Sequence, residues 1–471
     1  MKNKILLINP PCEFKTPVLP LGLAYIAAYL QKNNFDVSVI DAWAEKLDYP
    51  ELKSKIFKNK PDIIGIFMDS PRYDETKKTI EICREALPDS LIVAGGPHPS
   101  ALSVQTLKEI PQLDICAIGE GEITMYELAK VAEKNGSFSA IDGIVYRDKE
   151  TGEIKNAKAR AFIENLDDLP FPARELFPVK KYKTHPPYGR KNPYFSMITS
   201  RGCPYHCAYC SKGVFGQIYH ALSPKRVCDE MEYLINNFNA REIHFYDDDF
   251  TMDMRRVEEI CEEILRRKIK ISWSCTTRVN LVNESLLNKM KQAGCWLIAY
   301  GVESGNQKIL DTVNKGIAIK QIETAFELTR KIGIGTLAYL MVGLPGETKK
   351  TIKETISLAK KIKPNFVSWG ILVIYPGSEF FRAVQNGTYK GRLRTLNKGD
   401  NLAGTFFGKG NYVVAEDNLS FEELRESIRK ANKAFYLRPS YIFESIKNIS
   451  SFSNLIYYLN GGIEVLKSAF G

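Results

Sequence analysis

The chain has 471 residues, of which 44% are hydrophobic and 25% are charged, a composition typical of a globular protein with more than one domain. No stretch has the roughly 20 consecutive apolar residues of a membrane-spanning helix, and the short apolar run before Asn9 predicts a core strand, not a signal peptide. The formal net charge of +10 is spread along the chain beside acidic residues. This pattern favours solvated helix faces over a nucleic-acid-binding patch.

Short apolar runs alternate with helix-like segments from residue 1 to 148. Strands that alternate with helices predict an α/β domain with a doubly wound, Rossmann-like parallel sheet. Ligands of such sheets bind in a crevice at the carboxyl ends of the strands. The predicted strands are 5–8, 37–40, 63–67, 91–96 and 114–119.

The loops after these strands are rich in glycine and proline. Glycine lets a backbone approach a ligand closely, and proline fixes the shape of a loop before a ligand binds. Because four such loops meet at one sheet edge, we expect one large, flat ligand to lie across it. The candidate contacts are Asn9, Pro10, Pro11, Ser70, Gly95, Gly96, His98, Gly119, Glu120 and Gly121.

A proline-rich and charged linker is predicted over 149–192. A second strand–helix series fills 193–390 and predicts a partial (β/α)6-type barrel. Residues 391–471 form a mixed, mainly helical tail, whose aromatic side chains either pack on the barrel, line an apolar cavity or rest on a membrane. These side chains are Phe435, Tyr436, Tyr441, Phe443, Tyr457 and Tyr458.

Three cysteines follow the first barrel strand with a C-x3-C-x2-C spacing, at Cys203, Cys207 and Cys210. Thiolates suit zinc or iron–sulfur clusters, but a tetrahedral zinc site needs a fourth ligand. His206 is too close in sequence to Cys207 to serve in the same site. The triplet therefore predicts a [4Fe-4S] cluster with one iron left open. The other seven cysteines are isolated, which predicts buried thiols in a reducing cytoplasm and no disulfide framework.

The triplet and its context resemble the radical S-adenosylmethionine (SAM) enzymes. In that superfamily the open iron binds the amino and carboxylate groups of SAM, and reductive cleavage releases a 5′-deoxyadenosyl radical. The resemblance implies that Tyr209 lies near the adenine and that Glu303 accepts from the ribose hydroxyls. It further implies that Arg278 meets the SAM carboxylate. The glycine-rich motif that usually binds the amino group is replaced by FYDDDFT, where Asp247 and Asp248 are the candidate acceptors.

The N-terminal domain, with NPP, GGPHPS and GEGE after its strands, resembles the cobalamin-binding subfamily of these enzymes. The resemblance implies a corrin ring on the strand ends, facing the cluster. The D-x-H-x-x-G motif that supplies a histidine to cobalt in other cobalamin carriers is absent, because 9–18 reads NPPCEFKTPV. No histidine of this loop should therefore reach cobalt, and His98 is expected at the periphery of the ligand.

The family resemblance favours an enzyme that methylates an unactivated carbon, with one SAM methylating cobalt and a second generating the radical. Oxidation, cyclisation or rearrangement without methyl transfer is the first alternative. An RNA-modifying enzyme and a non-catalytic cobalamin sensor are two others. The expected partners are a small-molecule substrate, with an apolar lipid or isoprenoid-like compound as one hypothesis, and an electron donor such as flavodoxin or ferredoxin. We also expect a cytoplasmic location, with peripheral membrane contact as an alternative.

Overall fold

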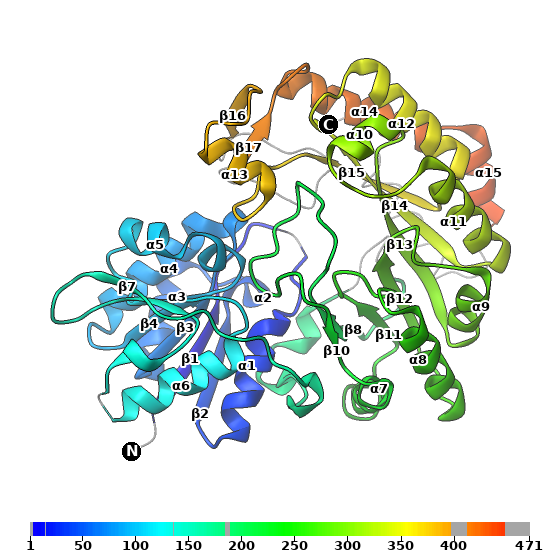
Figure 1. Ribbon diagram of the computed structural model, residues 1–471. Helices are drawn as coiled ribbons and strands as arrows, with labels where there is room; N and C mark the ends of the chain where they lie inside the picture. Colours follow the sequence, from blue (N-terminus) through cyan, green and yellow to red (C-terminus); the bar gives the residue numbers. More distant parts are fainter. Residues whose placement is uncertain (1–2, 15, 135, 184–188, 397–411, 448–471) are drawn as a thin grey trace.

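The computed structural model describes residues 3–14, 16–134, 136–183, 189–396 and 412–447. Two α/β units lie side by side, the N-terminal unit in blue to cyan and a barrel-like unit in green to yellow (Figure 1). Among the described residues no helix is both long and apolar enough to cross a membrane.

The N-terminal unit is built on a seven-stranded sheet with the order β2-β1-β3-β4-β5-β6-β7. The first five strands in that order pair in parallel, whereas β6 and β7 pair antiparallel. The sheet therefore continues into the predicted linker segment. The strands are β1 (Lys4–Asn9), β2 (Asp36–Asp41), β3 (Ile63–Phe67), β4 (Leu91–Gly95), β5 (Ile115–Ala117), β6 (Ile144–Arg147) and β7 (Ile154–Asn156).

Helices cover both faces of this sheet, as a doubly wound fold requires. Ile5 and Leu7 of β1 pack against α1 and α6, whereas Leu6 and Ile8 pack on the opposite face against α3, α4 and α5. Successive side chains of a strand point to opposite faces, so a continuous apolar run is what a sheet buried on both sides needs. The helices are α1 (Leu21–Lys32), α2 (Ala42–Glu45), α3 (Tyr49–Asn59), α4 (Tyr73–Ala86), α5 (Pro97–Glu109) and α6 (Gly121–Glu133).

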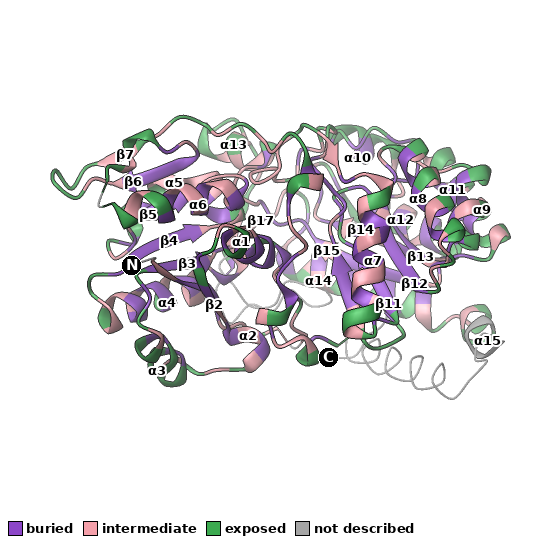
Figure 2. Ribbon diagram, turned by 90° about the horizontal axis from the view of Figure 1, so that it is seen from below, coloured by how far each residue is buried: buried purple, intermediate pink, exposed green. Residues whose placement is uncertain are grey.

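The second unit is a six-stranded parallel sheet with the order β15-β14-β13-β12-β11-β8. Within the described part of the chain, β8 and β15 do not pair with each other, so the barrel is partial, in agreement with the sequence prediction. Both sheets are buried in the interior of their units (Figure 2). The strands are β8 (Tyr194–Met197), β11 (Glu242–Phe245), β12 (Ser272–Thr277), β13 (Cys295–Glu303), β14 (Gly335–Val342) and β15 (Phe366–Ile371).

Amphipathic helices cover the outside of this sheet. In α8, Val257, Ile260, Cys261 and Ile264 recur at spacings of three and four residues and are all buried, which is the apolar stripe of a helix packed on a core. The helices are α7 (Pro224–Phe238), α8 (Met254–Arg266), α9 (Glu284–Gln292), α10 (Gln307–Thr312), α11 (Ile319–Ile332), α12 (Lys349–Ile362) and α13 (Glu379–Gln385). A short antiparallel pair, β9 (Ser200–Arg201) and β10 (His220–Ala221), follows β8.

The tail packs on the barrel. It contains the antiparallel pair β16 (Leu393–Leu396) and β17 (Tyr412–Ala415), then α14 (Phe421–Tyr436) and α15 (Pro439–Lys447). Phe435 is fully buried, and the hydroxyl groups of Tyr436 and Tyr441 bond to the main chain at the start of β15. These aromatics therefore serve packing, whereas Tyr457 and Tyr458 lie outside the described residues.

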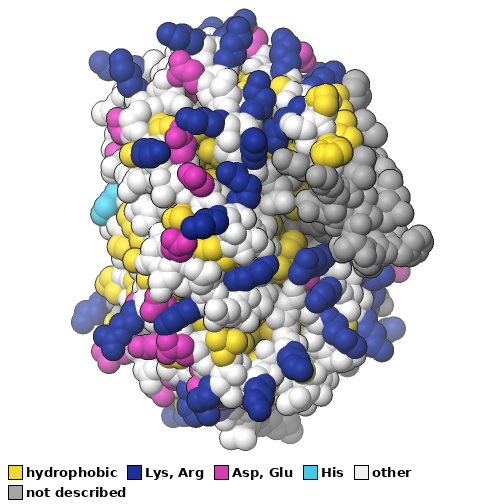
Figure 3. Space-filling view, turned by 90° about the vertical axis from the view of Figure 1, so that its right-hand side faces the viewer, with side chains coloured by type: hydrophobic (Ala, Val, Ile, Leu, Met, Phe, Trp, Pro, Cys, Tyr) yellow, Lys and Arg dark blue, Asp and Glu magenta, His cyan; other side chains and the backbone are white. Residues whose placement is uncertain are grey.

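Lys and Arg side chains are scattered over the face in Figure 3 and are interspersed with Asp and Glu. This distribution agrees with the interpretation of the net charge as solvated helix faces.

The linker joins the two units through buried polar contacts. Arg174 donates to the main-chain oxygen of Ser196 at 2.9 Å and pairs with Glu230 of α7 at 2.7 Å, and neither charged side chain is exposed. Further along the linker, the Tyr182 hydroxyl donates to the Asp41 carboxylate, which ends β2, at 2.6 Å. The linker is therefore part of the packed structure rather than a free tether.

We predict that Arg174→Met destabilises the folded chain by about 1.5–3 kcal/mol, the range for a hydrogen bond to a charged group, because the buried Glu230 then keeps only Arg226, at 3.4 Å, as an ion-pair partner among the described residues. Guanidinium unfolding followed by fluorescence and circular dichroism measures the change. Lys53→Met is the control: Lys53 and its partner Glu85 are both largely exposed, so its loss should cost about 1 kcal/mol or less. Equal effects of the two substitutions would contradict the prediction.

Candidate active site

The three predicted cysteines lie on the loop between β9 and β10, which follows β8 and runs between the two units (Figure 1). Gly202 begins this loop with a φ of 81°, and a Cβ placed there would lie 2.1 Å from the main-chain oxygen of Ile218. Only glycine fits at this step. Cys203 and Cys207 are half-buried and Cys210 is exposed, so the thiols are accessible to a ligand.

The thiols lie near one another. The pKa of Cys210 is raised to about 11, first by desolvation and then by the neighbouring Cys207 and Cys203. Among the described residues, no three His, Cys, Asp or Glu side chains are close enough to hold one metal ion. A four-iron cluster does not need that closeness, because each thiolate binds a different iron. Three adjacent soft ligands on one loop therefore fit such a cluster. Of the other cysteines, all but the half-buried Cys12 are buried, as predicted.

Arg278 follows β12 and faces the cysteine loop. Its Nη1 donates to Cys207 Sγ at 3.6 Å, and its guanidinium carbon lies 3.6 Å from the centroid of the Tyr205 ring. Nη2 donates to the main-chain oxygen of Lys315, and Nε donates to Asn280 Oδ1 at 3.2 Å. This guanidinium is therefore fixed beside the thiols before any ligand arrives.

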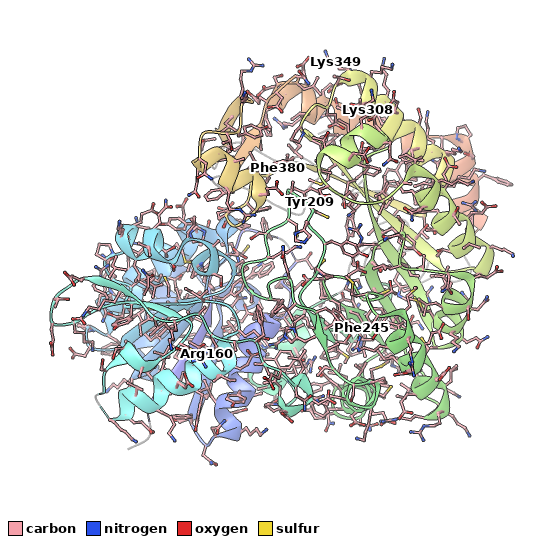
Figure 4. All side chains as sticks on the ribbon, in the orientation of Figure 1. Arg160, Tyr209, Phe245, Lys308, Lys349 and Phe380 are labelled. Atoms are coloured by element: carbon pink, nitrogen blue, oxygen red, sulfur yellow. The ribbon has the colours of Figure 1, made fainter. Side chains whose placement is uncertain are left out.

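Glu303 ends β13 and Tyr209 comes from the cysteine loop, and a lysine joins them. Lys315 Nζ lies 2.7 Å from Glu303 Oε1 and 3.2 Å from the Tyr209 hydroxyl. Figure 4 places Tyr209 on the loop between the barrel and α13, close to Phe380 of that helix. The structure thus brings Tyr209, Arg278 and Glu303 together at the cysteine loop.

The three aspartates after β11 have different environments. Asp247 is buried and accepts from the main-chain and side-chain groups of Thr199 and from the Ser200 hydroxyl, at 2.6–2.7 Å. Asp248 is exposed. Asp249 is 2% exposed and its Oδ1 accepts from the Thr277 hydroxyl at 2.5 Å, but its buried Oδ2 has no hydrogen-bond partner among the described residues. Desolvation raises the pKa of Asp249 to about 6, although the nearby Arg278 lowers it.

Polar residues meet at the carboxyl ends of β1, β2 and β3. Asn9 donates to Asp41 at 2.9 Å and accepts from Arg72 at 3.0 Å. Arg72 pairs with Asp69 at 2.8 Å and is 7% exposed. Asn9 thus belongs to a buried network below the loop, and Pro10 and the following residues leave the strand without regular structure.

Ser70 and His98 are brought together although 28 residues separate them. The Ser70 hydroxyl lies 2.9 Å from His98 Nδ1, and burial lowers the pKa of His98 to about 4, so the ring is neutral near pH 7. Gly96 precedes α5 with a φ of 121°, and a Cβ there would lie 2.7 Å from the main-chain oxygen of Met68. Glycine is needed for this close turn. Pro11 and Gly95 lie at the same sheet edge.

The GEGE segment joins the two units. Arg201, two residues before Cys203, pairs with Glu120 at 2.5 Å and with Glu122 at 2.6 Å, and all three side chains are at most 4% exposed. His220 Nε2 lies 3.2 Å from Glu120. The Glu120 side chain, expected at the flat ligand, is therefore engaged with the barrel unit, while Gly119 and Gly121 flank it.

The cysteine loop packs directly on the N-terminal unit. A Cβ built at Gly213 would lie 3.3 Å from Ser100 Cβ of α5, and one built at Gly119 would lie 3.5 Å from the main-chain oxygen of Val214. The strand-end loops therefore face the cysteines. The strand-end loops offer glycine turns together with hydroxyl, amide and main-chain groups. These groups fit a corrin ring, because the rim of the ring carries amide groups that form hydrogen bonds.

An apolar pocket lies where the loop after β1, the linker and the edge of the barrel meet. Two of its lining residues, Val18 and Tyr246, are 41% and 43% exposed, although both are largely apolar. An exposed apolar surface inside a concave site is typical of a ligand pocket. The pocket is lined by Thr16, Pro17, Val18, Leu19, Tyr182, Lys183, Tyr194, Phe195, Ser196 and Tyr246.

Four polar residues of this region were not predicted from the sequence. Lys315, Asp249, Arg72 and Arg201 all carry charge into the interior. Asp249 is adjacent to the two candidate aspartates, and Arg201 directly precedes Gly202 and the cysteine triplet. Their sequence positions could therefore have identified both as site residues. Nothing in the sequence identifies Lys315 or Arg72 as a buried residue of the site, because a single basic residue in a turn is usually solvated.

Comparison with known proteins agrees with this architecture. The Radical SAM superfamily matches residues 197–359, and the B12 binding domain matches residues 13–129. An uncharacterised methyltransferase of Pyrococcus horikoshii is 32% identical over 94% of both chains. The anaerobic magnesium-protoporphyrin IX monomethyl ester cyclase of Rubrivivax gelatinosus is 30% identical over 90% of this chain and 74% of its own length.

Two solved structures have the same fold. The radical SAM methyltransferase TsrM from Kitasatospora setae, solved with tryptophan and a SAM analogue, superposes with a TM-score of 0.75 at 17% identity, over 93% of this chain and 89% of its own. The cobalamin-dependent enzyme OxsB, solved with aqua-cobalamin and SAM, gives a TM-score of 0.76 at 20% identity, over 99% of this chain and 72% of its own. The two domain matches, the full-length relatives and the cysteine loop agree, and the chain belongs to the cobalamin-dependent radical SAM enzymes.

Proposed function

We propose that this enzyme transfers a methyl group to an unactivated carbon of a small-molecule substrate. The observation that carries the proposal is the packing of the cysteine loop on the carboxyl edge of the cobalamin domain, which would hold both cofactors close to each other. The full-length likeness to a protein named as a methyltransferase favours methyl transfer. Bound together, the cluster, SAM and cobalamin supply a carbon-centred radical and a methyl donor.

The chain's own residues bind and orient these groups. In this proposal Cys203, Cys207 and Cys210 hold the cluster, Tyr209 contacts the adenine, Arg278 the SAM carboxylate and Glu303 the ribose. Asn9, Ser70, His98 and the strand-end glycines and prolines contact the corrin ring. Fixed positions matter because reacting groups held in a productive geometry lose less freedom in the transition state.

Asp249 is the acceptor we propose for the SAM amino group, in place of the earlier candidates. Its buried Oδ2 is the carboxylate oxygen without a described partner, whereas Asp247 already accepts from Thr199 and Ser200. An ionised acceptor gives a stronger hydrogen bond to an ammonium group than a neutral one does.

A substrate pocket between loop 16–19, the linker and the barrel edge supports an apolar substrate, because Val18, Leu19 and three tyrosines line it. We propose a lipid or isoprenoid-like compound, of which this pocket, at about 30 Å³, would take only a terminal apolar group. Reduction of the cluster calls for an electron donor such as flavodoxin or ferredoxin. We infer a cytoplasmic location, since cluster thiolates persist in a reducing compartment.

Cyclisation without methyl transfer is the second candidate, favoured by the likeness to the Rubrivivax cyclase. In this alternative, the same residues around the cysteine loop bind the cofactors. The difference from the first candidate is that cobalt does not donate a methyl group.

The central test is anaerobic. The protein, reconstituted with iron, sulfide and hydroxocobalamin, is given reductant and SAM, and 5′-deoxyadenosine and S-adenosylhomocysteine are both quantified. We expect both products, and we expect Cys203→Ala to abolish the deoxyadenosine. Cys116→Ala, which changes a buried cysteine far from the loop in sequence, should keep both. Deoxyadenosine without S-adenosylhomocysteine would favour the cyclase alternative, and neither product would argue against radical chemistry.

We predict that Asp249→Asn weakens SAM binding about tenfold while binding of 5′-deoxyadenosine, which has no amino group, stays within about twofold. Equilibrium dialysis against the reconstituted protein measures both. Asp247→Asn should instead lower the melting temperature, because a neutral amide loses the charge-assisted hydrogen bonds from Thr199 and Ser200 and the attraction to Arg256. A larger loss of SAM affinity in Asp248→Asn than in Asp249→Asn would sink the assignment.

Membrane contact has support only from the exposed side chains of Ile442 and Phe443 on α15, at 46% and 60% exposure. We expect cosedimentation with anionic liposomes, weakened in an Ile442→Asp, Phe443→Asp double variant. A wild-type protein that stays in the supernatant would remove the membrane part of the proposal and leave the apolar substrate untouched.

A further inference from the structure

Lys315 is held against the cysteine loop by its own main chain. The turn that contains it follows α10 and bonds to the loop at two points: the Ala208 amide donates to the Val313 oxygen at 3.0 Å, and Asn314 Nδ2 donates to the His206 oxygen at 3.0 Å. The Lys315 oxygen itself accepts from Arg278. This segment therefore moves with the cluster-binding loop rather than with the barrel surface.

The ammonium group of Lys315 is buried, with the whole residue 6% exposed. Its Nζ contacts Glu303 Oε1 at 2.7 Å and the Tyr209 hydroxyl at 3.2 Å. A Cβ built at Gly301 would lie 2.8 Å from both Glu303 Oε1 and Lys315 Nζ, so glycine at that position leaves the space for the pair.

The Glu303 backbone also needs an explanation. Its φ is 66°, in the left-handed region that non-glycine residues seldom adopt, at a point where the register between β13 and β14 shifts. Such a conformation persists when surrounding contacts determine it. In the described part of the chain, Lys315 is the ion-pair partner of Glu303, and it binds only one of the two carboxylate oxygens.

We propose that Lys315 is a positioning residue for the nucleoside of SAM. It fixes Glu303 through Oε1, so that Oε2 is presented to the ribose hydroxyls. The ammonium also gives the Glu303 carboxylate an ion-pair partner while the site has no ligand, since an isolated buried carboxylate is costly. This inference rests on the role that the proposed function gives to Glu303.

A structural role predicts something different. If Lys315 only fastened the turn after α10 to the barrel, its loss would weaken every ligand of the site alike. If it orients Glu303 toward the ribose, its loss should weaken only ligands that carry the ribose hydroxyls. The two roles separate when the substitution is combined with a change in the ligand.

The test uses the reconstituted enzyme and equilibrium binding of two ligands, SAM and a SAM analogue that lacks both ribose hydroxyls. We expect Lys315→Met to weaken SAM binding about tenfold, the size of one hydrogen bond to a charged group, and to change analogue binding less than about twofold. Lys315→Arg, which keeps the charge, should retain part of the affinity. Lys308→Met, at an exposed position of α10, is the matched control and should bind as wild type.

Cluster absorbance and circular dichroism identify a variant that has lost its fold or its cluster. If Lys315→Met is such a variant, SAM and analogue binding are compared in Lys315→Arg instead. Equal losses for SAM and the analogue, or no loss for either, would overturn the positioning role. If the wild-type enzyme itself binds SAM and the analogue equally, the ribose role of Glu303 in the proposed function fails instead.

Discussion

The buried pairing of Arg201 with Glu120 and Glu122 is the interaction on which the catalytic arrangement depends. Three charges lie at most 4% exposed between a helix start of the cobalamin domain and the strand that leads into the cysteine loop. A substitution of any one of these residues would leave a buried charge without its partner, so the contact holds the two units in one defined arrangement. It ties the carboxyl edge of the cobalamin domain to the strand that begins the cysteine loop.

The cysteine loop is held from several sides at once. Ala208 bonds both to the turn after α10 and to α13, and the Ser211 hydroxyl donates to the Pro376 oxygen at 2.7 Å. On the other side, Gly213 leaves room for α5 of the cobalamin domain. An irregular loop that is clamped in this way positions its thiols as firmly as a strand would, which radical chemistry at a defined carbon requires.

Periodicity and loop composition were sufficient to predict the five parallel strands of the first sheet, the partial barrel and the loop that carries the three cysteines, but not the antiparallel strand β6. Continuous apolar runs such as 5–8 identify strands buried on both faces, and the triplet with its glycine identifies the loop. Long-range pairings were not predictable, because Arg201 meets Glu120 and Lys315 meets Glu303 only after the chain has folded. For the same reason the pairing of Glu120, a candidate ligand contact, with Arg201 of the barrel unit was not predicted. The linker strand β7 was missed, since its three residues carry no clear period.

The contacts of the linker restrict the motions that the enzyme can make during turnover. Ala173 donates a hydrogen bond to the main chain of α1, Arg174 pairs with Glu230 of α7, and Tyr182 donates to Asp41 at the end of β2. The linker is therefore bonded to both units. A hinge that swung the units apart would expose these groups on every catalytic cycle. Exchange of product for fresh substrate is therefore expected to proceed by small displacements of surface loops, on a faster timescale than the opening of whole domains.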